Sequence, residues 1–510
     1  MTTRRDFLRL AAAAPLVGLA SRPVYAVGPT EVPRITFYGS TRQVSGSCHI
    51  LETGDGVYLV DCGSFISDVP DPDAANRDFP FEPKDIKGLL LTHAHADHTG
   101  RLPLLYKKGF RGAVYCTDAT RDMTEVSLVQ SAQIGADQEE EPLFDLKDAR
   151  GVLGLIKVVP YNQKFDVGKM TVRYTDAGHI LGSAMAEVWT DGRKILFSGD
   201  MGPDSTPILC SPAQHYGADA VLVESTYGPV PRPQISYGDV GLKVAEVLKR
   251  GGSVLFPSFA LHKTQLLVYI LNKMMLEGTV PRAPIISDSS SSQKFTKIYE
   301  AYTEYHDPEA RDFARKRGSL FYLPNYREMK VTDSLKSHAG KTPAIYISTS
   351  GMITHAAAPK HLYEMAKDEK NAVLIPGYQA PKTVGRRLLD GEKAFKITLE
   401  DFTNGKLTKE EKDLDVKLEV AKVSGFSSHA PGQQILEWVN KFDRVGPVYV
   451  VHGDESNAVG LSDKMKEMKV ESEAPKKHQT FVVKGDRVKA GDVPKCEAPK
   501  KNVNPAPVDK

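Results

Sequence analysis

The chain has 510 residues, which is too long for one ordinary hydrophobic core, so two or more domains are expected. Hydrophobic residues make up 41% and charged residues 25% of the chain, close to the usage of soluble globular proteins. The formal net charge is only +2, which excludes the strong overall basic balance of many nucleic-acid binders. Any binding of nucleic acid must therefore come from a local groove.

Residues 1–26 have the order of an export signal. The pair Arg4-Arg5 precedes an apolar run at residues 10–20, and a short segment ending at Ala26 follows, an order that resembles a twin-arginine signal. The apolar run has about 11 residues, against the ~20 needed to span a bilayer, which argues against a membrane anchor. We expect export to a bacterial periplasm, cleavage after Ala26, and a nearly neutral mature chain without stable membrane association.

Five cysteines occur, at positions 48, 62, 116, 210 and 496. They are too few and too scattered for a disulfide framework, and none forms a CxxC pair. An odd number leaves at least one thiol free unless it pairs between chains.

Short apolar runs alternate with helical patterns along most of the chain, which predicts an α/β protein. Residues 49–60 indicate a hairpin with a Gly-Asp-Gly turn, and residues 66–85, rich in Pro and Asp, indicate a surface loop. Apolar residues have helical spacing at 120–134 and 237–250. The segment 229–233, with three prolines, predicts a domain boundary. A second α/β stretch follows, with strands at 253–257 and 344–348 and a helix at 263–276.

Five strand-like runs each end in a residue that can bind metal or move a proton. Residues 88–92 lead into His93-Ala94-His95-Ala96-Asp97-His98, residues 170–175 lead to His179, and the runs 194–199, 220–223 and 448–451 end at Asp200, Glu224 and His452. Near-continuous apolar runs are typical of strands buried on both faces, and functional groups gather on loops at one end of such sheets. If these strands are neighbours, their ends place His, Asp and Glu in one pocket.

The spacing within residues 93–98 suits two metal ions. Residues two apart in an extended turn point the same way, so His93 and His95 can hold one ion, while Asp97 and His98 can face a second. Imidazole nitrogens and carboxylate oxygens suit Zn²⁺ at ~2.0–2.2 Å, and the two oxygens of Asp200 can bridge two ions. The alternative, a polar loop of solvated histidines, is disfavoured because such clusters seldom form without a metal.

The motif His-x-His-x-Asp-His, with His179 and Asp200 further along, resembles the metallo-β-lactamase superfamily, whose fold packs two β-sheets face to face with helices outside. Further motifs resemble its β-CASP branch: Glu224-Ser225-Thr226-Tyr227-Gly228, Phe259-Ala260-Leu261, Ser350-Gly351-Met352, Gly377-Tyr378-Gln379-Ala380, Gly385-Arg386-Arg387-Leu388-Leu389, Ser427-Ser428-His429-Ala430 and Val451-His452-Gly453. That branch includes bacterial RNA-degrading nucleases and the endonuclease of eukaryotic pre-mRNA 3′-end cleavage. The match covers roughly residues 34–465, with the motifs in the expected order.

The resemblance implies an α/β fold, in which an αββα sandwich carries an inserted α/β β-CASP domain. The expected divisions are the signal at 1–26, the first part of the metallo-β-lactamase domain at 27–232, the inserted domain at 233–393, the second part of the sandwich at 394–484, and a flexible tail at 485–510. The tail is rich in Pro and Lys and has few large apolar residues.

The resemblance also implies a ligand set for two Zn²⁺, although the same ligands accept Mn²⁺ or Fe²⁺. The first ion would be held by His93, His95, His179 and Asp200, and the second by Asp97, His98, Asp200 and His452. Asp61 would orient ligand side chains without binding a metal itself. The alternative is a plain turn aspartate.

The mechanism implied for this site is two-metal hydrolysis. Two cations lower the pKa of a shared water toward ~7, and the resulting hydroxide would attack phosphorus. Asp97 is expected to be a catalytic residue as well as a metal ligand. His429, steadied by Glu224, would protonate the leaving alkoxide. The alternative for His429 is a loop histidine that caps a helix at 431–442.

The chain departs from the β-CASP pattern in the inserted domain. His262-Lys263 stands where related nucleases usually carry Gly-Arg, and lysine keeps the charge but not the bidentate phosphate contact of arginine. Ala380-Pro381-Lys382 and residues 354–359 also differ from the usual pattern. Lys263, Ser350 and Arg386 remain candidate phosphate contacts. The other histidines, His49, His215, His262, His355 and His361 among them, are expected to be packing or surface residues.

Three functions are compatible with these residues. The first is a phosphodiesterase that binds RNA, or less readily DNA, in the cleft between the two domains of the protein and cleaves it there. The second is a small-molecule hydrolase, lactamase-like or thioester-cleaving, but such enzymes usually lack the inserted domain. The third is a non-catalytic nucleic-acid binder, which the complete metal and acid sets argue against. A di-iron redox role is weaker, since those relatives usually carry Glu at the position of His95.

Because RNA processing is cytoplasmic, an exported relative could scavenge extracellular nucleic acid or cleave another phosphodiester. The oligomeric state is left open, with a dimer among the states allowed.

Overall fold

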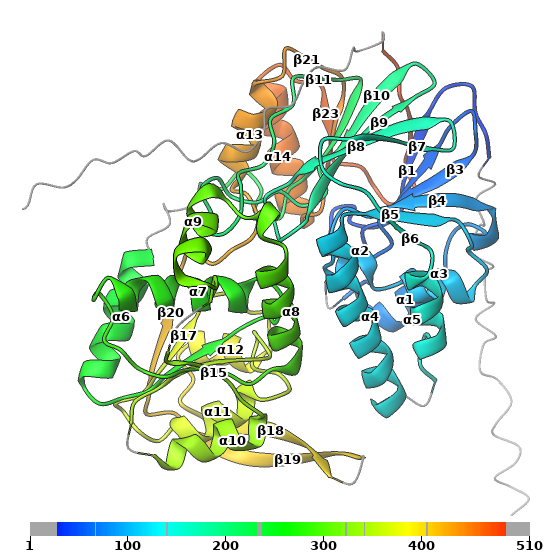
Figure 1. The fold of residues 1–510 in the computed structure, drawn as a ribbon. Coiled ribbons are helices and arrows are strands. Elements are labelled where there is room, and N and C mark those ends of the chain that lie inside the picture. The colour runs from blue at the N-terminus through cyan, green and yellow to red at the C-terminus, as the bar shows by residue number, and fades with distance from the viewer. Residues whose placement is uncertain are drawn as a thin grey trace, which may run out of the picture.

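The computed structural model describes residues 28–66, 68–138, 141–231, 237–321, 324–340, 342–403 and 406–485. These residues form a β-sandwich with helices outside and a second α/β domain beside it (Figure 1). The expected signal at 1–26 and, apart from Gly485, the expected tail lie outside the described residues. Within the described part, no helix combines the length and the hydropathy needed to cross a bilayer.

The sandwich consists of two seven-stranded sheets. The first has the order β24 (Thr480–Val482), β1 (Arg34–Phe37), β2 (His49–Glu52), β3 (Val57–Val60), β4 (Ile86–Leu90), β5 (Ala113–Cys116), β6 (Ile156–Val158). The second has the order β23 (Ser472–Glu473), β22 (Val448–Val451), β12 (Ala220–Glu224), β10 (Arg193–Phe197), β9 (Ala184–Thr190), β8 (Met170–Asp176), β7 (Lys164–Val167). Residues such as Phe37, Leu90 and Leu222 are fully buried between them. A short pair, β11 (Gly217–Ala218) and β21 (Arg444–Val445), adjoins the second sheet.

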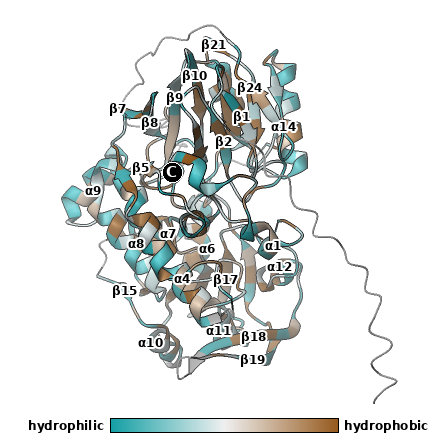
Figure 2. Ribbon diagram, turned by 90° about the vertical axis from the view of Figure 1, so that its right-hand side faces the viewer, coloured by the Kyte–Doolittle hydropathy of each residue, from teal (hydrophilic) through white to brown (hydrophobic). Residues whose placement is uncertain are grey.

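Helices cover the outer face of each sheet. On the first lie α1 (Pro72–Arg77), the 3₁₀ turn η1 (Pro83–Asp85), α2 (Ala96–Thr99), α3 (Leu102–Lys107), α4 (Asp118–Gln138) and α5 (Leu146–Leu153). On the second lie α13 (Gly432–Asn440) and α14 (Glu455–Glu467). This arrangement confirms the expected αββα sandwich. Figure 2 shows the same division by hydropathy, with hydrophobic residues gathered in the sandwich strands and hydrophilic ones on exposed helices such as α9.

Three strands of the second sheet place functional residues at one edge. β10 and β12 are parallel neighbours, and β12 is in turn parallel to β22. Because the carboxyl ends of parallel strands meet at the same edge, Asp200, Glu224 and His452 converge there. The condition that the sequence left open, that these strands are neighbours, is therefore met.

The inserted domain is built on a six-stranded, wholly parallel sheet. Its order is β15 (Tyr326–Glu328), β14 (Ile285–Ser287), β16 (Ile345–Ser348), β13 (Val254–Pro257), β17 (Ala372–Ile375), β20 (Glu419–Lys422). Its helices are α6 (Tyr237–Lys249), α7 (Lys263–Leu276), α8 (Ser290–Ala301), α9 (Pro308–Arg317), α10 (Val331–Lys336), α11 (Ala358–Met365) and α12 (Val384–Leu389), with the 3₁₀ turns η2 (Thr303–Tyr305) and η3 (Ser337–Ala339). A two-stranded ribbon, β18 (Ala394–Thr403) and β19 (Lys406–Asp415), extends from it (Figure 1).

The return to the sandwich comes later than expected. The boundary was expected between residues 393 and 394, yet β20, at Glu419–Lys422, pairs with β17 as the edge strand of the inserted sheet. This pairing joins residues about fifty positions apart, so no local pattern reports it. The inserted sheet therefore ends with β20.

The segment 66–85 also differs from expectation, because it contains a helix as well as loop. Asp71 accepts a hydrogen bond from the backbone N–H of Ala74, and Pro72 occupies the first turn of α1. An aspartate cap followed by proline is a helix-start signal. The overall richness in Pro and Asp masked that signal.

The two domains meet beside α8. The backbone N–H of Leu181 donates to Tyr299 Oη at 3.2 Å, and Tyr302 Oη donates to Asp122 at 2.6 Å. Leu181 follows His179 by two residues, so the inserted domain lies directly against the edge that carries the candidate ligands.

Candidate metal centre and active site

Four of the predicted ligands form a first cluster. Beyond β4 the chain runs extended to His95, the N-cap of α2, so His93 and His95 project together. His95 Nδ1 lies 3.2 Å from His93 Nε2 and 3.0 Å from His179 Nε2. His93 Nε2 and His179 Nε2 each lie 3.5 Å from Asp200 Oδ2. One ligand atom of each of these four residues lies within 4.8 Å of the others, so a single metal ion could contact all four.

The remaining ligands form a second cluster beside the first. His98 Nε2 and His452 Nε2 each lie 3.4 Å from Asp200 Oδ1, and His452 Nε2 lies 3.4 Å from Asp97 Oδ2. Asp200 therefore presents one oxygen to each cluster, which is the geometry of a carboxylate that bridges two ions. All seven predicted ligands come together.

The chemistry of these side chains fits divalent cations. Both oxygens of Asp200 and Nε2 of His98 are buried without a hydrogen-bond partner among the described residues. Leaving such atoms unsatisfied costs about 1–3 kcal/mol each, and a bound cation removes that cost. Burial lowers the pKa of His93 and His179 well below the usual value, which keeps both in the neutral form that binds metals.

Two contacts behind the ligands fix which nitrogen each ring presents. Asp61 accepts hydrogen bonds from the backbone N–H and Oγ1 of Thr92, at 2.8 and 2.9 Å, and its Oδ2 lies 2.7 Å from His98 Nδ1. His179 Nδ1 donates to the carbonyl of Ser428 at 2.7 Å. Each partner accepts the proton on Nδ1, so Nε2 is left free to face the cluster. This geometry fits an orienting residue at Asp61 better than a plain turn aspartate.

The candidate proton donor lies at the rim of the same site. His429 Nδ1 is 3.1 Å from both oxygens of the fully buried Glu224 and 3.9 Å from Asp200 Oδ2. Glu224 also accepts a hydrogen bond from the backbone N–H of Met201 at 2.8 Å. The His429 side chain is 18% exposed, so it can reach a substrate. It does not cap α13, whose N-cap is Pro431, with no side-chain cap bond.

One residue at the site had no role assigned from sequence. Thr226 Oγ1 lies 3.0 Å from His452 Nδ1 and 3.2 Å from His429 Nδ1. It belongs to the motif at 224–228, but a threonine two residues past a strand end has no spacing that marks it. A chamber of about 20 Å³, lined in part by His49 and Ser198, also has His98, Asp200 and His452 in its wall.

Two of the candidate phosphate contacts follow parallel strands of the inserted sheet. Lys263 begins α7 after β13, and Ser350 follows β16, so both lie at the carboxyl edge of that sheet. Lys263 Nζ is 5.3 Å from the ring centre of Phe259 and has no acidic partner among the described residues. Burial lowers the pKa of Lys263 to about 8. The Ser350 hydroxyl accepts from the backbone N–H of Thr354 at 2.9 Å.

Arg386 is placed differently. Its guanidinium is half exposed and lies 2.9 Å from the carboxylate of Asp390. That ion pair already neutralises the charge, so Lys263 is the stronger candidate for an anion. Of the histidines expected to be packing or surface residues, His49, His215, His262 and His361 are buried and His355 is exposed.

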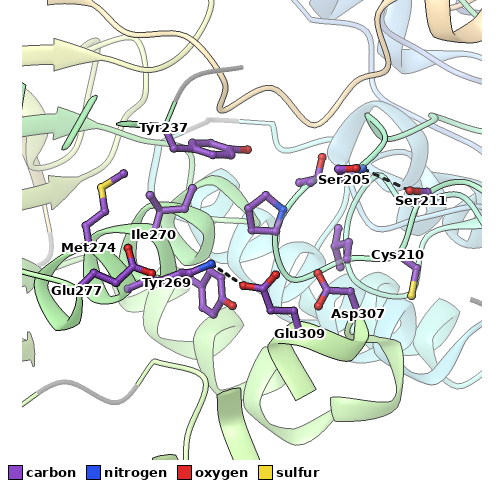
Figure 3. Close-up of a pocket in the computed structure, with 14 residues that line it drawn as sticks. Ser205, Cys210, Ser211, Tyr237, Tyr269, Ile270, Met274, Glu277, Asp307 and Glu309 are labelled. Atoms are coloured by element: carbon purple, nitrogen blue, oxygen red, sulfur yellow. Dashed lines mark hydrogen bonds and ion pairs between the residues drawn. The ribbon is translucent and has the colours of Figure 1, made fainter. Parts of the chain in front are cut away.

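A larger cavity, of about 250 Å³, lies away from these clusters. It is bounded by the loop at 205–211 and by α6, α7 and α9, as Figure 3 shows. An ion pair of 2.5 Å joins Lys273 and Glu309 at its wall. None of the candidate ligands lines it, so the metal chemistry belongs to the cluster around Asp200.

Comparison with known proteins agrees with this geometry. Family models match residues 41–240 (Metallo-beta-lactamase superfamily), 264–388 (Beta-Casp domain) and 413–475 (Zn-dependent metallo-hydrolase RNA specificity domain). Ribonuclease TTHA0252 of Thermus thermophilus is 31% identical over 435 residues, covering 84% of this chain and 95% of that protein. The chain belongs to the β-CASP branch of the metallo-β-lactamase superfamily. The predicted superfamily and branch are thus confirmed, and this β-CASP protein is a metal-dependent hydrolase.

Further similar proteins also match over most of the chain. Transcription termination factor FttA of Methanocaldococcus jannaschii is 30% identical, over 85% of this chain and 69% of that protein. An RNase J-like protein of the same organism is 27% identical, over 84% of this chain and 94% of that protein. A crystal structure of a protein of unknown function from Enterococcus faecalis V583 has a TM-score of 0.53 and 13% identity, covering 88% of this chain and all of that one. That last likeness concerns the fold alone.

Proposed function

We propose that this β-CASP enzyme is a ribonuclease that hydrolyses phosphodiester bonds with two zinc ions. The observation that carries the proposal is the sharing of Asp200 between two ligand clusters, with His429 and Glu224 at their rim. The names of the relatives and the match to an RNA specificity model at 413–475 support RNA as the substrate.

The roles of the residues follow from their positions. When bound, two divalent cations lower the pKa of a water toward ~7 and offset the charge that develops on the phosphoryl oxygens. His93, His95 and His179 would hold the first cation, and Asp97, His98 and His452 would hold the second. Asp200, which presents one oxygen to each cluster, would contribute a ligand atom to each site.

Proton transfer to the leaving oxygen belongs to His429. Its Nδ1 faces Glu224, so Nε2 is the nitrogen left to donate a proton. The Glu224 carboxylate fixes the orientation of the ring. A positioned general acid contributes on the order of 10²–10⁴ in rate.

Substrate binding is assigned to the carboxyl edge of the inserted sheet. The nearly neutral chain supplies little long-range attraction for a polyanion, so short-range contacts matter more. Lys263, which has no acidic partner within the described part of the chain, and Ser350 would contact backbone phosphates. Arg386 could do so only after releasing Asp390.

The test uses purified, zinc-loaded protein with labelled RNA, single-stranded DNA and bis-p-nitrophenyl phosphate. We expect cleavage of RNA that a chelator abolishes and added zinc restores. Preferential cleavage of DNA would change the substrate but keep the chemistry. Inertness toward all three, alongside hydrolysis of a lactam or thioester, would defeat the proposal in favour of a small-molecule hydrolase.

Export is a separate part of the proposal, supported by the order of residues 1–26. The twin-arginine route would deliver a folded, metal-loaded enzyme to the periplasm. Changing Arg4 and Arg5 together to lysine should retain the full-length protein in the cytoplasm, as measured by cell fractionation. An unchanged distribution would remove the export route.

A further inference from the structure

The hydroxyl of Thr226 lies between a candidate metal ligand and the candidate proton donor. Its Oγ1 is 3.0 Å from His452 Nδ1 and 3.2 Å from His429 Nδ1. The centres of those two rings are 5.6 Å apart. One short side chain from the loop after β12 therefore touches both functional rings.

The contact with His452 decides which of its nitrogens carries the proton. His452 Nε2 faces Asp97 and Asp200, each at 3.4 Å, so Nε2 is the atom that must keep a free lone pair for a cation. The proton of the neutral ring must then lie on Nδ1, and Thr226 Oγ1 is its acceptor. Metal-binding histidines usually have such a partner on their second nitrogen.

The same hydroxyl also restrains the backbone of His452. Thr226 Oγ1 donates to the carbonyl oxygen of His452 at 3.2 Å, and the backbone N–H of Ser225 donates to the same oxygen at 3.3 Å. His452 has a φ of 54°, a left-handed conformation that non-glycine residues seldom adopt. Ring and backbone of this residue are thus both fixed from one side chain.

Toward His429 the hydroxyl acts as a spacer. His429 Nδ1 donates to Glu224, so the proton of Thr226 is directed to the carbonyl of His452, and its oxygen faces His429. The backbone N–H of Thr226 donates to Glu224 at 3.2 Å, which ties the threonine to the carboxylate that holds His429.

We propose that Thr226 is a positioning residue, whose hydroxyl sets the tautomer of His452 for metal binding and fixes the spacing between that ligand and His429. The inference rests on the proposed function and deepens it, because it names the side chain that fixes the positions of His452 and His429 relative to each other. Thr226 itself touches neither substrate nor metal in this assignment.

A matched pair of substitutions tests it. Thr226→Ser keeps the hydroxyl and loses the methyl group, whereas Thr226→Val keeps the shape and loses the hydroxyl. Zinc affinity is measured by competition with a chelator of known affinity, without any substrate. We expect Thr226→Val to weaken zinc binding at the second site, which contains His452, about 10–100-fold, and Thr226→Ser to stay near wild type. With bis-p-nitrophenyl phosphate, kcat should fall in Thr226→Val while KM stays unchanged.

A purely structural role predicts the reverse order, because valine packs like threonine and serine leaves a gap. Wild-type zinc affinity in Thr226→Val, or a greater loss in Thr226→Ser, would overturn the inference. Should Thr226→Val not fold, Thr226→Ala provides the same loss of hydroxyl without added bulk. If wild-type protein fails to cleave RNA, the proposed function falls, but the affinity measurement still decides the role of Thr226.

Discussion

Both carboxylate oxygens of Glu224 lie 3.1 Å from Nδ1 of His429, and Glu224 has no exposed surface. A buried carboxylate needs such partners, since an unpaired charge in the interior is costly. The pair fixes Nδ1 as the inward nitrogen of His429 and leaves Nε2 for the proton transfer that we propose.

Removal of His429 tests the proton donor. His429→Ala should lower kcat for RNA on the order of 10²–10⁴-fold, because a positioned general acid is lost, while both metals stay bound. The measurements are single-turnover rates and metal content by mass spectrometry. His355→Ala is the matched control for metal content, since His355 is exposed and belongs to neither cluster. Near-normal turnover in His429→Ala would take this residue out of the mechanism.

The sharing of Asp200 predicts different metal losses for two substitutions. Asp200→Asn should weaken both metal sites, because one oxygen faces each cluster and an amide supplies only one neutral oxygen. His452→Ala should weaken only the second site. Metal content after dialysis distinguishes them, with close to none expected in the first variant and close to one ion in the second. Equal losses in the two variants would contradict the bridging role.

Substitution of Asp61 is expected to weaken metal binding although no metal ligand is altered. Asp61→Asn keeps the shape but weakens acceptance of the proton on His98 Nδ1, so zinc affinity should fall about 10–100-fold. Titration with a competing chelator measures this. Asp55→Asn is a suitable control, because Asp55 follows β2 in the same hairpin and contacts no ligand. A plain turn aspartate at position 61 would leave zinc affinity unchanged.

Lys263 predicts how RNA binding depends on pH. Burial lowers the pKa of this lysine to about 8, so its ammonium is charged below pH 8 and neutral above it. Affinity for RNA should therefore fall as the pH rises from 7 to 9. Fluorescence anisotropy with labelled RNA in the His429→Ala background measures binding without turnover.

The control for that prediction is Lys263→Arg. Arginine remains charged through this range, so its affinity should hardly change between pH 7 and 9. Lys263→Met should bind more weakly throughout and also lack the pH dependence. The same slope in all three proteins would show that another group titrates.

Several elements could be predicted because their signals are local. The helix expected at 263–276 has the bounds of α7, since these fourteen residues contain several Leu and Met and neither Gly nor Pro. The ligands at 93–98 follow from their spacing alone. The helix α1 was missed, because Pro and Asp indicate loops as readily as helix starts.

The ligand types, their order along the chain and the strand that precedes each one can be inferred from the amino-acid sequence, because short-range spacing and apolar runs record them directly. The folded chain is needed to show that β10, β12 and β22 are neighbours, that β20 completes the inserted sheet, and that Thr226 lies between His429 and His452. These relationships depend on backbone pairing between segments up to about 230 residues apart, and such pairing leaves no trace in the local pattern of either segment.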